Sequence, residues 1–351
     1  MSDGGASAMP PRRPRVLGQT VTANAVLGVL ALLVACLLPA VTGFRGTTPN
    51  VVLFVGIYMV LSLGLNVVVG FTGLLDLGYV TFLVTGAVVA AFLLSLTRTP
   101  DGTLDWQIGT TASIPGEPVL GPTWGVLLVL AAAGAVCAVV GVLRGIPTLR
   151  LRGDYYAIVT LGIAEIVYET ALWDETNPVN FQRVTGGAFG IKLPSSHVPE
   201  FLGAKLYWDD WRFYYLVVAL VVLTMVVTHH LNRSRVGRAL AAIRLDETAA
   251  RACGVDVSRH KLIAFAVSGF IGGVGGAMYV LWKGGAVAVK SLDVWQSILI
   301  LCGVVLGGMG SIRGTAIGIA ALMGLGELLR EDFGGVTVPP EARYLIYGLL
   351  L

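Results

Sequence analysis

The sequence alternates between polar segments and predominantly apolar runs of about 20 residues, the length that crosses about 30 Å of hydrocarbon as a helix. Only 13% of the residues are charged, roughly half the share found in soluble domains. The chain therefore has too few charged residues to cover so many apolar ones with the polar surface of a soluble protein. This pattern excludes a soluble domain and predicts an all-α, polytopic integral membrane protein.

The apolar runs place about ten transmembrane helices along the chain. We expect them near residues 23–43, 51–70, 74–96, 123–143, 154–172, 212–231, 261–282, 294–310, 314–330 and from 343 to 351. The first run is longer than the core of a signal peptide, so we expect a retained helix. The last run is too short to cross a bilayer, so we expect this helix to be incomplete.

The predicted helices define two regions. Residues 1–20 are rich in Pro, Gly, Ser and Arg and have almost nothing to bury, so we interpret them as a disordered cytoplasmic tail. Residues 21–351 then form one transmembrane domain. Within it, short Gly spacings such as Gly269/Gly273 and Gly314/Gly318 predict close helix packing.

Basic residues are distributed unevenly between the two sides of the membrane. With a cytoplasmic N-terminus, fourteen of the 24 Lys and Arg residues lie in cytoplasmic loops, Arg144 among them. The positive-inside rule favours this orientation. It places a cytoplasmic loop at 232–260 and outer loops at 97–122 and 173–211.

Several classes of protein are disfavoured by what the sequence lacks. The four cysteines form no Cys-x-x-Cys pair, the four histidines have no metal-ligand spacing, and none of the lysines sits in a G-x-x-x-x-G-K-[ST] loop. A net charge of +3 is too small to indicate nucleic-acid binding. The sequence therefore predicts no metal site, no enzyme active site and no nucleotide site in this chain.

A Gly-rich break interrupts the apolar segment GLNVVVGFTGLLDLGYVTF at 64–82, where Gly70, Gly73 and Gly78 surround Asp76. Unpaired backbone is tolerated at membrane depth only against protein or a water-filled cavity, so the break is a candidate substrate site. The alternative is a cytoplasmic turn in which Asp76 caps the next helix. A second Gly-rich break at 307–314 is the candidate equivalent in a related half of the chain.

A carboxylate lies inside the segment LRLRGDYYAIVTLGIAEIVYE at 149–169. Glu165 falls about 16 Å along the helix from Asp154, near the middle of the membrane. An intramembrane carboxylate is a candidate for substrate contact. The simpler alternative is a hydrogen bond to a neighbouring helix, and the sequence leaves both open.

An amphipathic segment, SRVGRALAAIRLDETAARACGVDVSRHK, occupies 234–261. Its alanines alternate with charged residues as short helical turns, and Gly254 is suited to end the last of them. Such a helix can lie on a partner protein. The alternative is a solvated loop held near anionic lipid.

Together with VTGGAFGI at 184–191 and VVLGGMGSIRG at 304–314, these segments resemble the LivM-type permease of branched-chain amino acid ABC importers. The resemblance covers about 51–351 and implies a subunit that forms half of a translocation pathway in the bacterial cell membrane. It implies as partners a second permease of the LivH type, two cytoplasmic ATPase subunits of the LivG and LivF types, an extracytoplasmic substrate-binding protein and membrane lipid. ATP and Mg would be bound by the ATPases, with no cofactor on this chain.

The resemblance also implies three groups of functional residues. The substrate pathway would include Asn66, Gly73, Asp76, Thr81, Glu165 and Gly308. The ATPase-coupling group would include Arg244, Asp246, Glu247, Thr248, Ala249, Ala250 and Gly254. The binding-protein side would include Thr185, Gly186 and Gly187.

The chain departs from the family pattern at three places. Thr248 occupies the Glu position of the E-A-A-x-x-x-G pattern, with Glu247 one residue earlier. Ala188 and Phe189 stand where a Pro-Asn pair is usual, and Asp76 stands where Ser is common. An added negative charge at Asp76 would attract a cationic ammonium group.

Three other functions compete with this interpretation. The first is the same type of importer with urea or a short amide as its cargo. The second is an ATP-independent secondary transporter, which the scarcity of intramembrane ionisable groups (Asp76, Glu165, Glu169 and Glu327) disfavours. The third is a membrane enzyme, for which no catalytic motif is present.

Overall fold

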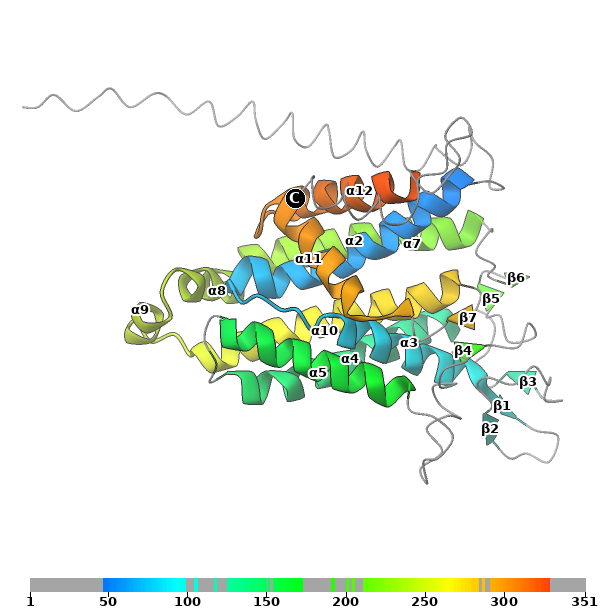
Figure 1. Cartoon of the computed structure of the whole chain (residues 1–351), viewed down its shortest axis with the longest axis horizontal. Coiled ribbons are helices and arrows are strands. Elements are labelled where there is room, and N and C mark those ends of the chain that lie inside the picture. The colour runs from blue at the N-terminus through cyan, green and yellow to red at the C-terminus, as the bar shows by residue number, and fades with distance from the viewer. Residues whose placement is uncertain are drawn as a thin grey trace, which may run out of the picture.

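The computed structural model describes residues 47–98, 104–106, 117–118, 125–149, 151, 154–172, 191–192, 200–201, 204–205, 211–283, 286–287 and 291–328. Most of these residues form helices that run along one long axis (Figure 1). The helices are α2 (Thr47–Thr72), α3 (Val80–Ser95), α4 (Gly125–Thr148), α5 (Asp154–Leu172), α7 (Trp211–Arg233), α8 (Arg235–Leu245), α9 (Glu247–Ala252), α10 (Val257–Trp282), α11 (Val294–Gly307) and α12 (Ile312–Leu328). The predicted tail, the spans at 23–43 and 343–351, and the VTGG segment lie outside the described residues.

Short antiparallel strands, which the sequence did not predict, lie at the end of the bundle opposite α8 and α9 (Figure 1). One sheet has the order β2-β1-β3, with Thr97 opposite Asp105; the other two are the pairs β4-β7 and β5-β6. Their bounds are β1 (Leu96–Arg98), β2 (Leu104–Trp106), β3 (Glu117–Pro118), β4 (Ile191–Lys192), β5 (Glu200–Phe201), β6 (Ala204–Lys205) and β7 (Ala286–Val287). They pair backbone between loops and leave the helical architecture unchanged.

The predicted all-helical, membrane-spanning architecture is confirmed. Within the described residues, five helices are long and apolar enough to cross a membrane by length and composition: α2, α4, α5, α7 and α10. The shorter apolar helices α3, α11 and α12 flank the two Gly-rich breaks. The prediction erred at the helix ends, because α3 begins at Val80 rather than near 74 and α11 ends at Gly307.

The glycines of the breaks explain these shorter helices. Gly73, Gly308 and Gly310 have φ values of 76°, 91° and 89°, a left-handed region that glycine occupies without the penalty imposed by a Cβ. A helix cannot continue through such a residue. Each break therefore ends one helix and redirects the chain before the next begins.

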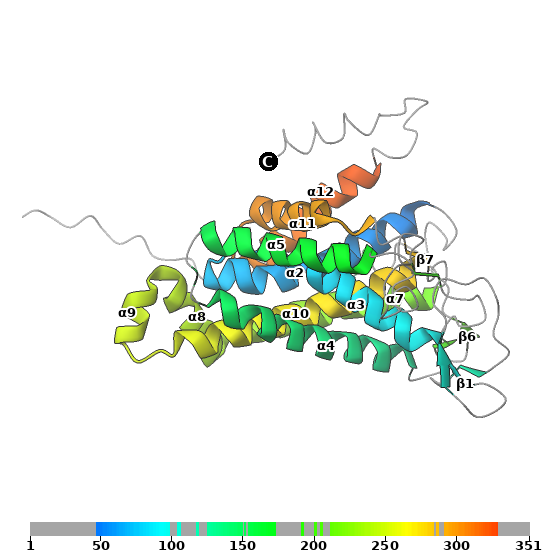
Figure 2. The same ribbon diagram turned by 60° about the horizontal axis from the view of Figure 1, so that its bottom comes forward.

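Helix α10 lies at the centre of the bundle between α3 and α4 (Figures 1 and 2). Two of its glycines face α4. A Cβ at Gly273 would lie 2.5 Å from the carbonyl oxygen of Ala133, and a Cβ at Gly269 would overlap the carbonyl oxygen of Cys137. Gly272 and Gly276 face α3 in the same way, against Phe82 and Leu83. The predicted role of these glycines in close helix packing is confirmed.

Close packing through glycines also joins α11 to α12. A Cβ at Gly318 would lie 2.5 Å from the carbonyl oxygen of Gly303, and one at Gly307 would overlap the carbonyl group of Gly314. The two helices therefore cross in near contact of their backbones. Because the second Gly-rich break lies between them, this contact fixes the direction in which the chain leaves the turn at 308–311.

Substitution of Gly86 tests the close contact between α3 and α10. A Cβ at Gly86 would overlap the backbone of Gly273, whereas one at Gly162 on α5 meets nothing within 4 Å. We expect Gly86→Ala to lower the melting temperature of the detergent-solubilised protein. The matched variant Gly162→Ala is expected to leave it unchanged or to raise it, because alanine is favoured over glycine in a helix by about 1 kcal/mol. Equal melting temperatures for the two variants would contradict this account of the packing.

Candidate functional site

Residues 73–79, here called the re-entrant segment, connect α2 to α3 without helical structure. Helix α2 has 26 residues, whereas α3 has only 16. Figure 1 shows this path from the α8 end of α2 into the bundle. Asp76, Gly78 and Tyr79 are buried within it. The helix break predicted from the sequence is thus present, and its central residues are buried within the bundle.

The backbone of the re-entrant segment finds its hydrogen-bond partners inside the protein. The amide of Gly78 donates to Oδ1 of Asp76 at 2.9 Å. The carbonyl of Gly78 accepts from Nη1 of Arg144 at 2.8 Å. The amide of Val80 donates to the hydroxyl of Ser297 on α11 at 2.7 Å. Such pairing is what permits non-helical backbone at this depth.

Asp76 and Arg144 form a buried ion pair, in which Nη2 of the guanidinium meets Oδ2 of the carboxylate. Their side chains are 0% and 3% exposed, and the guanidinium also lies 4.4 Å from the ring centroid of Phe82. The sequence analysis was wrong in placing Arg144 in a cytoplasmic loop, because this residue is in the last turns of α4. The cation beside Asp76 is thus supplied by the chain itself, and the carboxylate binds Gly78 rather than the first turn of α3.

A second cluster joins the break after α2 to the break between α11 and α12. The amide of Gly310 donates to Oδ1 of the buried Asn66 at 2.9 Å. One turn further along α2, the carbonyl of Gly70 accepts a hydrogen bond from Arg244 of α8 at 2.5 Å. The structure therefore places the predicted pathway residues Asn66 and Gly73 beside the predicted coupling residue Arg244.

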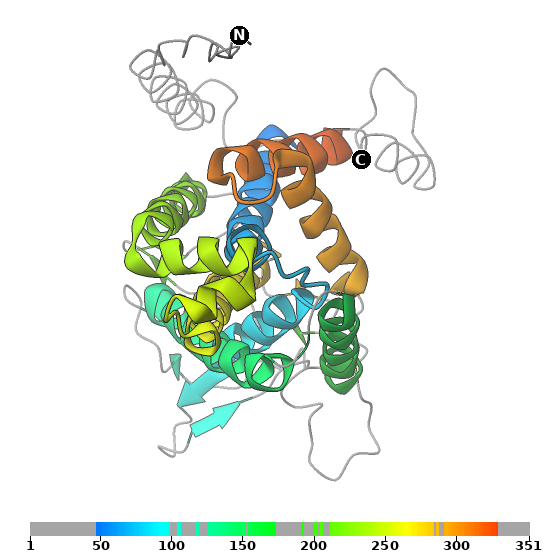
Figure 3. The same ribbon diagram turned by 90° about the vertical axis from the view of Figure 1, so that its left-hand side faces the viewer.

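Of the remaining predicted pathway residues, Gly308 lies in the turn of this cluster, whereas Thr81 and Glu165 lie elsewhere. Thr81 is buried in the first turn of α3, and its hydroxyl has no hydrogen-bond partner within the described part of the chain. Gly308 caps α11 and leaves open space where a Cβ would be. Glu165 is exposed on α5, which stands at the edge of the bundle below α11 when the molecule is viewed from the α8 end (Figure 3).

Residues 235–254, here called the elbow, comprise α8, Asp246, α9 and the turn to Gly254. The carboxylate of Asp246 accepts from the amides of Thr248 and Ala249 at 2.7 and 3.0 Å. These backbone hydrogen bonds lower the pKa of Asp246 because they stabilise its charged form. Gly254, at φ 82°, follows α9 as the sequence predicted. The elbow is therefore two short, capped helices rather than an irregular loop.

The side chains of the elbow divide into an outer and an inner set. Leu245 is 89% exposed, and Thr248 and Ala249 also face outward. Ala250 is 5% exposed and packs in an apolar cluster with Leu240 and Ile243. The two alanines of the family pattern therefore point in different directions. Leu245 was not predicted as a functional residue, although a single leucine between the charged residues Arg244 and Asp246 could have indicated an exposed apolar contact.

Glu247 fastens the elbow to α10. Its carboxylate accepts from Arg251 at 2.6 Å and from Lys261 at 2.9 Å. The Lys261 side chain is only 3% exposed, so this second contact is buried at its α10 end. The sequence analysis missed Lys261 as a functional partner, because nothing local to residue 261 shows which carboxylate it meets.

Two further predictions remain without a structural test. Thr185, Gly186 and Gly187 of the binding-protein side lie outside the described residues. Within the described ranges, no group of three or more His, Cys, Asp or Glu side chains is arranged to hold a metal ion.

Comparison with known proteins gives one consistent family. Residues 47–351 match the family described as branched-chain amino acid transport system / permease component. The chain is 34% identical over 341 residues to the high-affinity branched-chain amino acid transport system permease protein LivM of Salmonella typhimurium, covering 91% of this chain and 71% of that protein. It is 26% identical over 320 residues to the probable LivM permease of Methanocaldococcus jannaschii, covering 86% and 88%. No solved structure gives a significant match.

Removal of the charge on Asp76 tests the buried ion pair. Asp76→Asn leaves the Arg144 guanidinium buried without a counter-charge, so we expect a loss of about 3–5 kcal/mol in stability. The matched control is Arg251→Ala, which breaks an ion pair whose arginine is 52% exposed and is expected to cost less than about 1 kcal/mol. Thermal melting of both variants in detergent measures the difference. An Asp76→Asn protein as stable as Arg251→Ala would show that the pair does not hold the segment.

Proposed function

The chain belongs to the family of permease components of branched-chain amino acid transport systems, and on this premise we propose that it imports branched-chain amino acids as the membrane-spanning subunit of an ATP-driven ABC importer. It would form one half of the translocation pathway. The observation that carries this proposal is the elbow, which projects from one end of the bundle and is tied to both helix breaks. A transporter that works alone has no need of such a projection.

The energy for transport would come from partner subunits. The sequence has no nucleotide-binding loop, so we infer that ATP and Mg are bound by two cytoplasmic ATPases of the LivG and LivF types. A second permease of the LivH type would complete the pathway, and an extracytoplasmic binding protein would deliver the substrate. This chain would then be a transport subunit without enzymatic activity or a cofactor of its own.

The orientation follows from the charges and the elbow. The protein is a multi-pass membrane protein, and the basic residues favour a cytoplasmic N-terminus. The elbow then lies in the cytoplasm, where ATPases can reach it, and the short strands lie outside, where a binding protein docks (Figure 1). We propose that Thr185, Gly186 and Gly187 belong to this outer side.

The exposed face of helix α5 is the part of this chain best suited to line the translocation pathway. Its exposed residues share one face: Tyr155, Ile158, Gly162, Glu165, Ile166 and Glu169. A charge at the centre of a lipid-facing helix costs at least about 2.5–3.5 kcal/mol, so this face is better suited to protein and water than to lipid. We propose that it meets the second permease across the pathway. Its apolar residues would suit an aliphatic side chain, and Glu165 would suit the ammonium group.

The mechanism follows from the connection between the elbow and the breaks. When the ATPases close, they would move the elbow as a rigid body, because Asp246 and Gly254 fix both ends of α9. The movement would reach the chain around Asn66, Gly73 and Gly308, where the helices are already interrupted. These breaks would then open the cavity on one side and close it on the other, while the Asp76–Arg144 pair keeps the re-entrant segment in place.

Assembly with the ATPases tests the proposed function and the outer face of the elbow together. We expect the tagged chain, co-expressed with the second permease and both ATPases, to retain the ATPases in detergent, with hydrolysis stimulated by leucine-loaded binding protein. Ala249→Glu is expected to reduce the bound ATPase roughly tenfold or more without a change in melting temperature, because central contacts of an interface dominate its free energy. The same change at the buried neighbour, Ala250→Glu, is expected to lower the melting temperature as well.

Three outcomes would each overturn all or part of the proposal. Solute movement in liposomes by this chain alone, without ATP, would replace it with a secondary transporter. Stimulation by urea or a short amide instead of leucine would keep the importer and change its cargo. Full ATPase retention by Ala249→Glu would exclude the outward face of α9 as the contact.

Neutralisation of Glu165 tests its contact with substrate. If the carboxylate binds the ammonium group, Glu165→Gln should raise the KM for leucine roughly tenfold, since hydrogen bonds to charged groups contribute about 1.5–3 kcal/mol. ATPase retention should not change, and Glu169→Gln, one turn further out, should have a smaller effect. Loss of the second permease from the purified complex with an unchanged KM would assign Glu165 to helix contact instead.

A further inference from the structure

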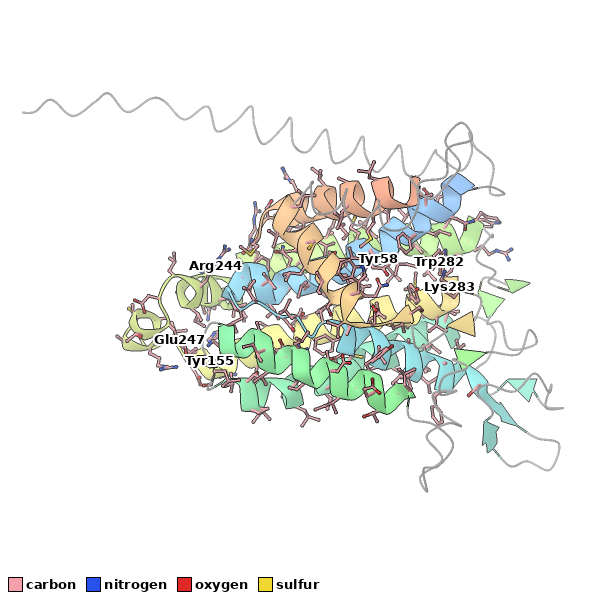
Figure 4. The ribbon with its side chains drawn as sticks, in the orientation of Figure 1. Tyr58, Tyr155, Arg244, Glu247, Trp282 and Lys283 are labelled. Carbon is pink, nitrogen blue, oxygen red and sulfur yellow. The ribbon has the colours of Figure 1, made fainter. Side chains whose placement is uncertain are left out.

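Two charged side chains tie the elbow to the membrane helices, and they reach different parts of the bundle. Arg244, in the last turn of α8, reaches the end of α2, whereas Glu247, the first residue of α9, reaches Lys261 of α10. Arg244 and Glu247 both lie at the α8 end of the molecule, far from Trp282 and Lys283 at the other end (Figure 4). The elbow therefore has two separate attachments on the side that faces the membrane.

The Arg244 side chain occupies the space between the two helix breaks. Its Nη1 donates to the carbonyl of Gly70 at 2.5 Å, and a cation is favoured at this carboxyl end of a helix. Its aliphatic part lies against Gly73, where a Cβ would be 3.1 Å from Cγ. A Cβ at Gly310 would lie 2.7 Å from Nη1. One side chain thus touches the end of α2 and the turn between α11 and α12.

Asn66 joins these two places from the other side. Asn66 lies on α2, one turn before Gly70. Its Oδ1 accepts from the amide of Gly310 at 2.9 Å. The end of α2 and the turn at 308–311 are consequently held to each other by Asn66 and to α8 by Arg244. A displacement of Arg244 therefore bears on both breaks at once.

Glycines with positive φ lie next to these contacts. Gly73 follows the end of α2, and Gly308 and Gly310 form the turn before α12. Hinges are a few residues that absorb large changes of φ and ψ, and glycine does so with little steric cost. The attachment at Lys261 differs, because it joins the elbow to α10, whose glycine faces are packed against α3 and α4. The elbow is thus fixed on one side and adjacent to hinges on the other.

We propose that Arg244 is the positioning residue that transmits movement of the elbow to both helix breaks, with the Glu247–Lys261 ion pair as the fixed point about which the elbow turns. This inference rests on the proposed function and adds a residue role to it. Arg244 was predicted to belong to the ATPase-coupling group. The residue as a whole is exposed, but its guanidinium binds Gly70 of the same chain, which makes it a link between the elbow and the end of α2.

The test compares Arg244→Gln with Arg238→Gln in the assembled importer. Both arginines are on α8 and donate to a backbone carbonyl, but Arg238 binds Arg233 at 3.0 Å, within the same cytoplasmic region. We expect Arg244→Gln to retain the ATPases and their hydrolysis of ATP, while leucine uptake per ATP falls roughly tenfold, a usual size for coupling between sites. Arg238→Gln should match the wild type. Arg244→Lys, which keeps the charge but lacks the planar guanidinium, should recover part of the uptake and carries the same comparison if Arg244→Gln does not fold.

The outcomes separate this inference from the proposed function. Loss of bound ATPase in Arg244→Gln with an unchanged melting temperature would make Arg244 a docking residue and overturn the link. Wild-type uptake per ATP in Arg244→Gln would also overturn it, while leaving the importer intact. A wild-type chain that retains no ATPase would remove the importer itself, and this inference with it.

Discussion

Non-helical backbone at membrane depth must find polar partners inside the protein, and here the buried Asp76–Arg144 ion pair provides them. The carboxylate holds the amide of Gly78 and the guanidinium holds its carbonyl. Without both charges, the segment between α2 and α3 would expose unpaired backbone to an apolar environment. A further polar partner comes from α11, where the hydroxyl of Ser297 accepts from the amide of Val80 at the start of α3.

The packing around α10 explains how such a segment is accommodated. Small residues allow α3 and α4 to approach α10 to backbone contact on two faces, which membrane helices use in place of a hydrophobic driving force. The same feature joins α11 to α12 beside the second break. The bundle is therefore rigid where glycines face another helix and changes direction where glycines adopt positive φ. Glycine serves both purposes because it lacks a Cβ.

The elbow shows how one short segment presents two surfaces. Leu245 and Ala249 are exposed on its outer side, whereas Arg244, Glu247 and Ala250 make contacts with the rest of the chain. In the proposed function, a partner that pulls or pushes on the outer side would act on α2 and on the turn at 308–311 through contacts that already exist. This arrangement suits a subunit that receives its energy from outside and uses it at the membrane.

The sequence by itself determined the membrane-spanning helices of the described residues, the positions of the two breaks and the existence of an amphipathic segment at 234–261. These features are local, since they depend on runs of apolar residues, on glycine and on helical periodicity. The tertiary structure alone decided the partners: Asp76 pairs with Arg144 across 68 positions, Arg244 with Gly70 across 174, and Asn66 with Gly310 across 244. No local pattern specifies such pairs, because they depend on which helix faces pack together, and so the contact of Arg244 with the end of α2 appears only in the folded chain.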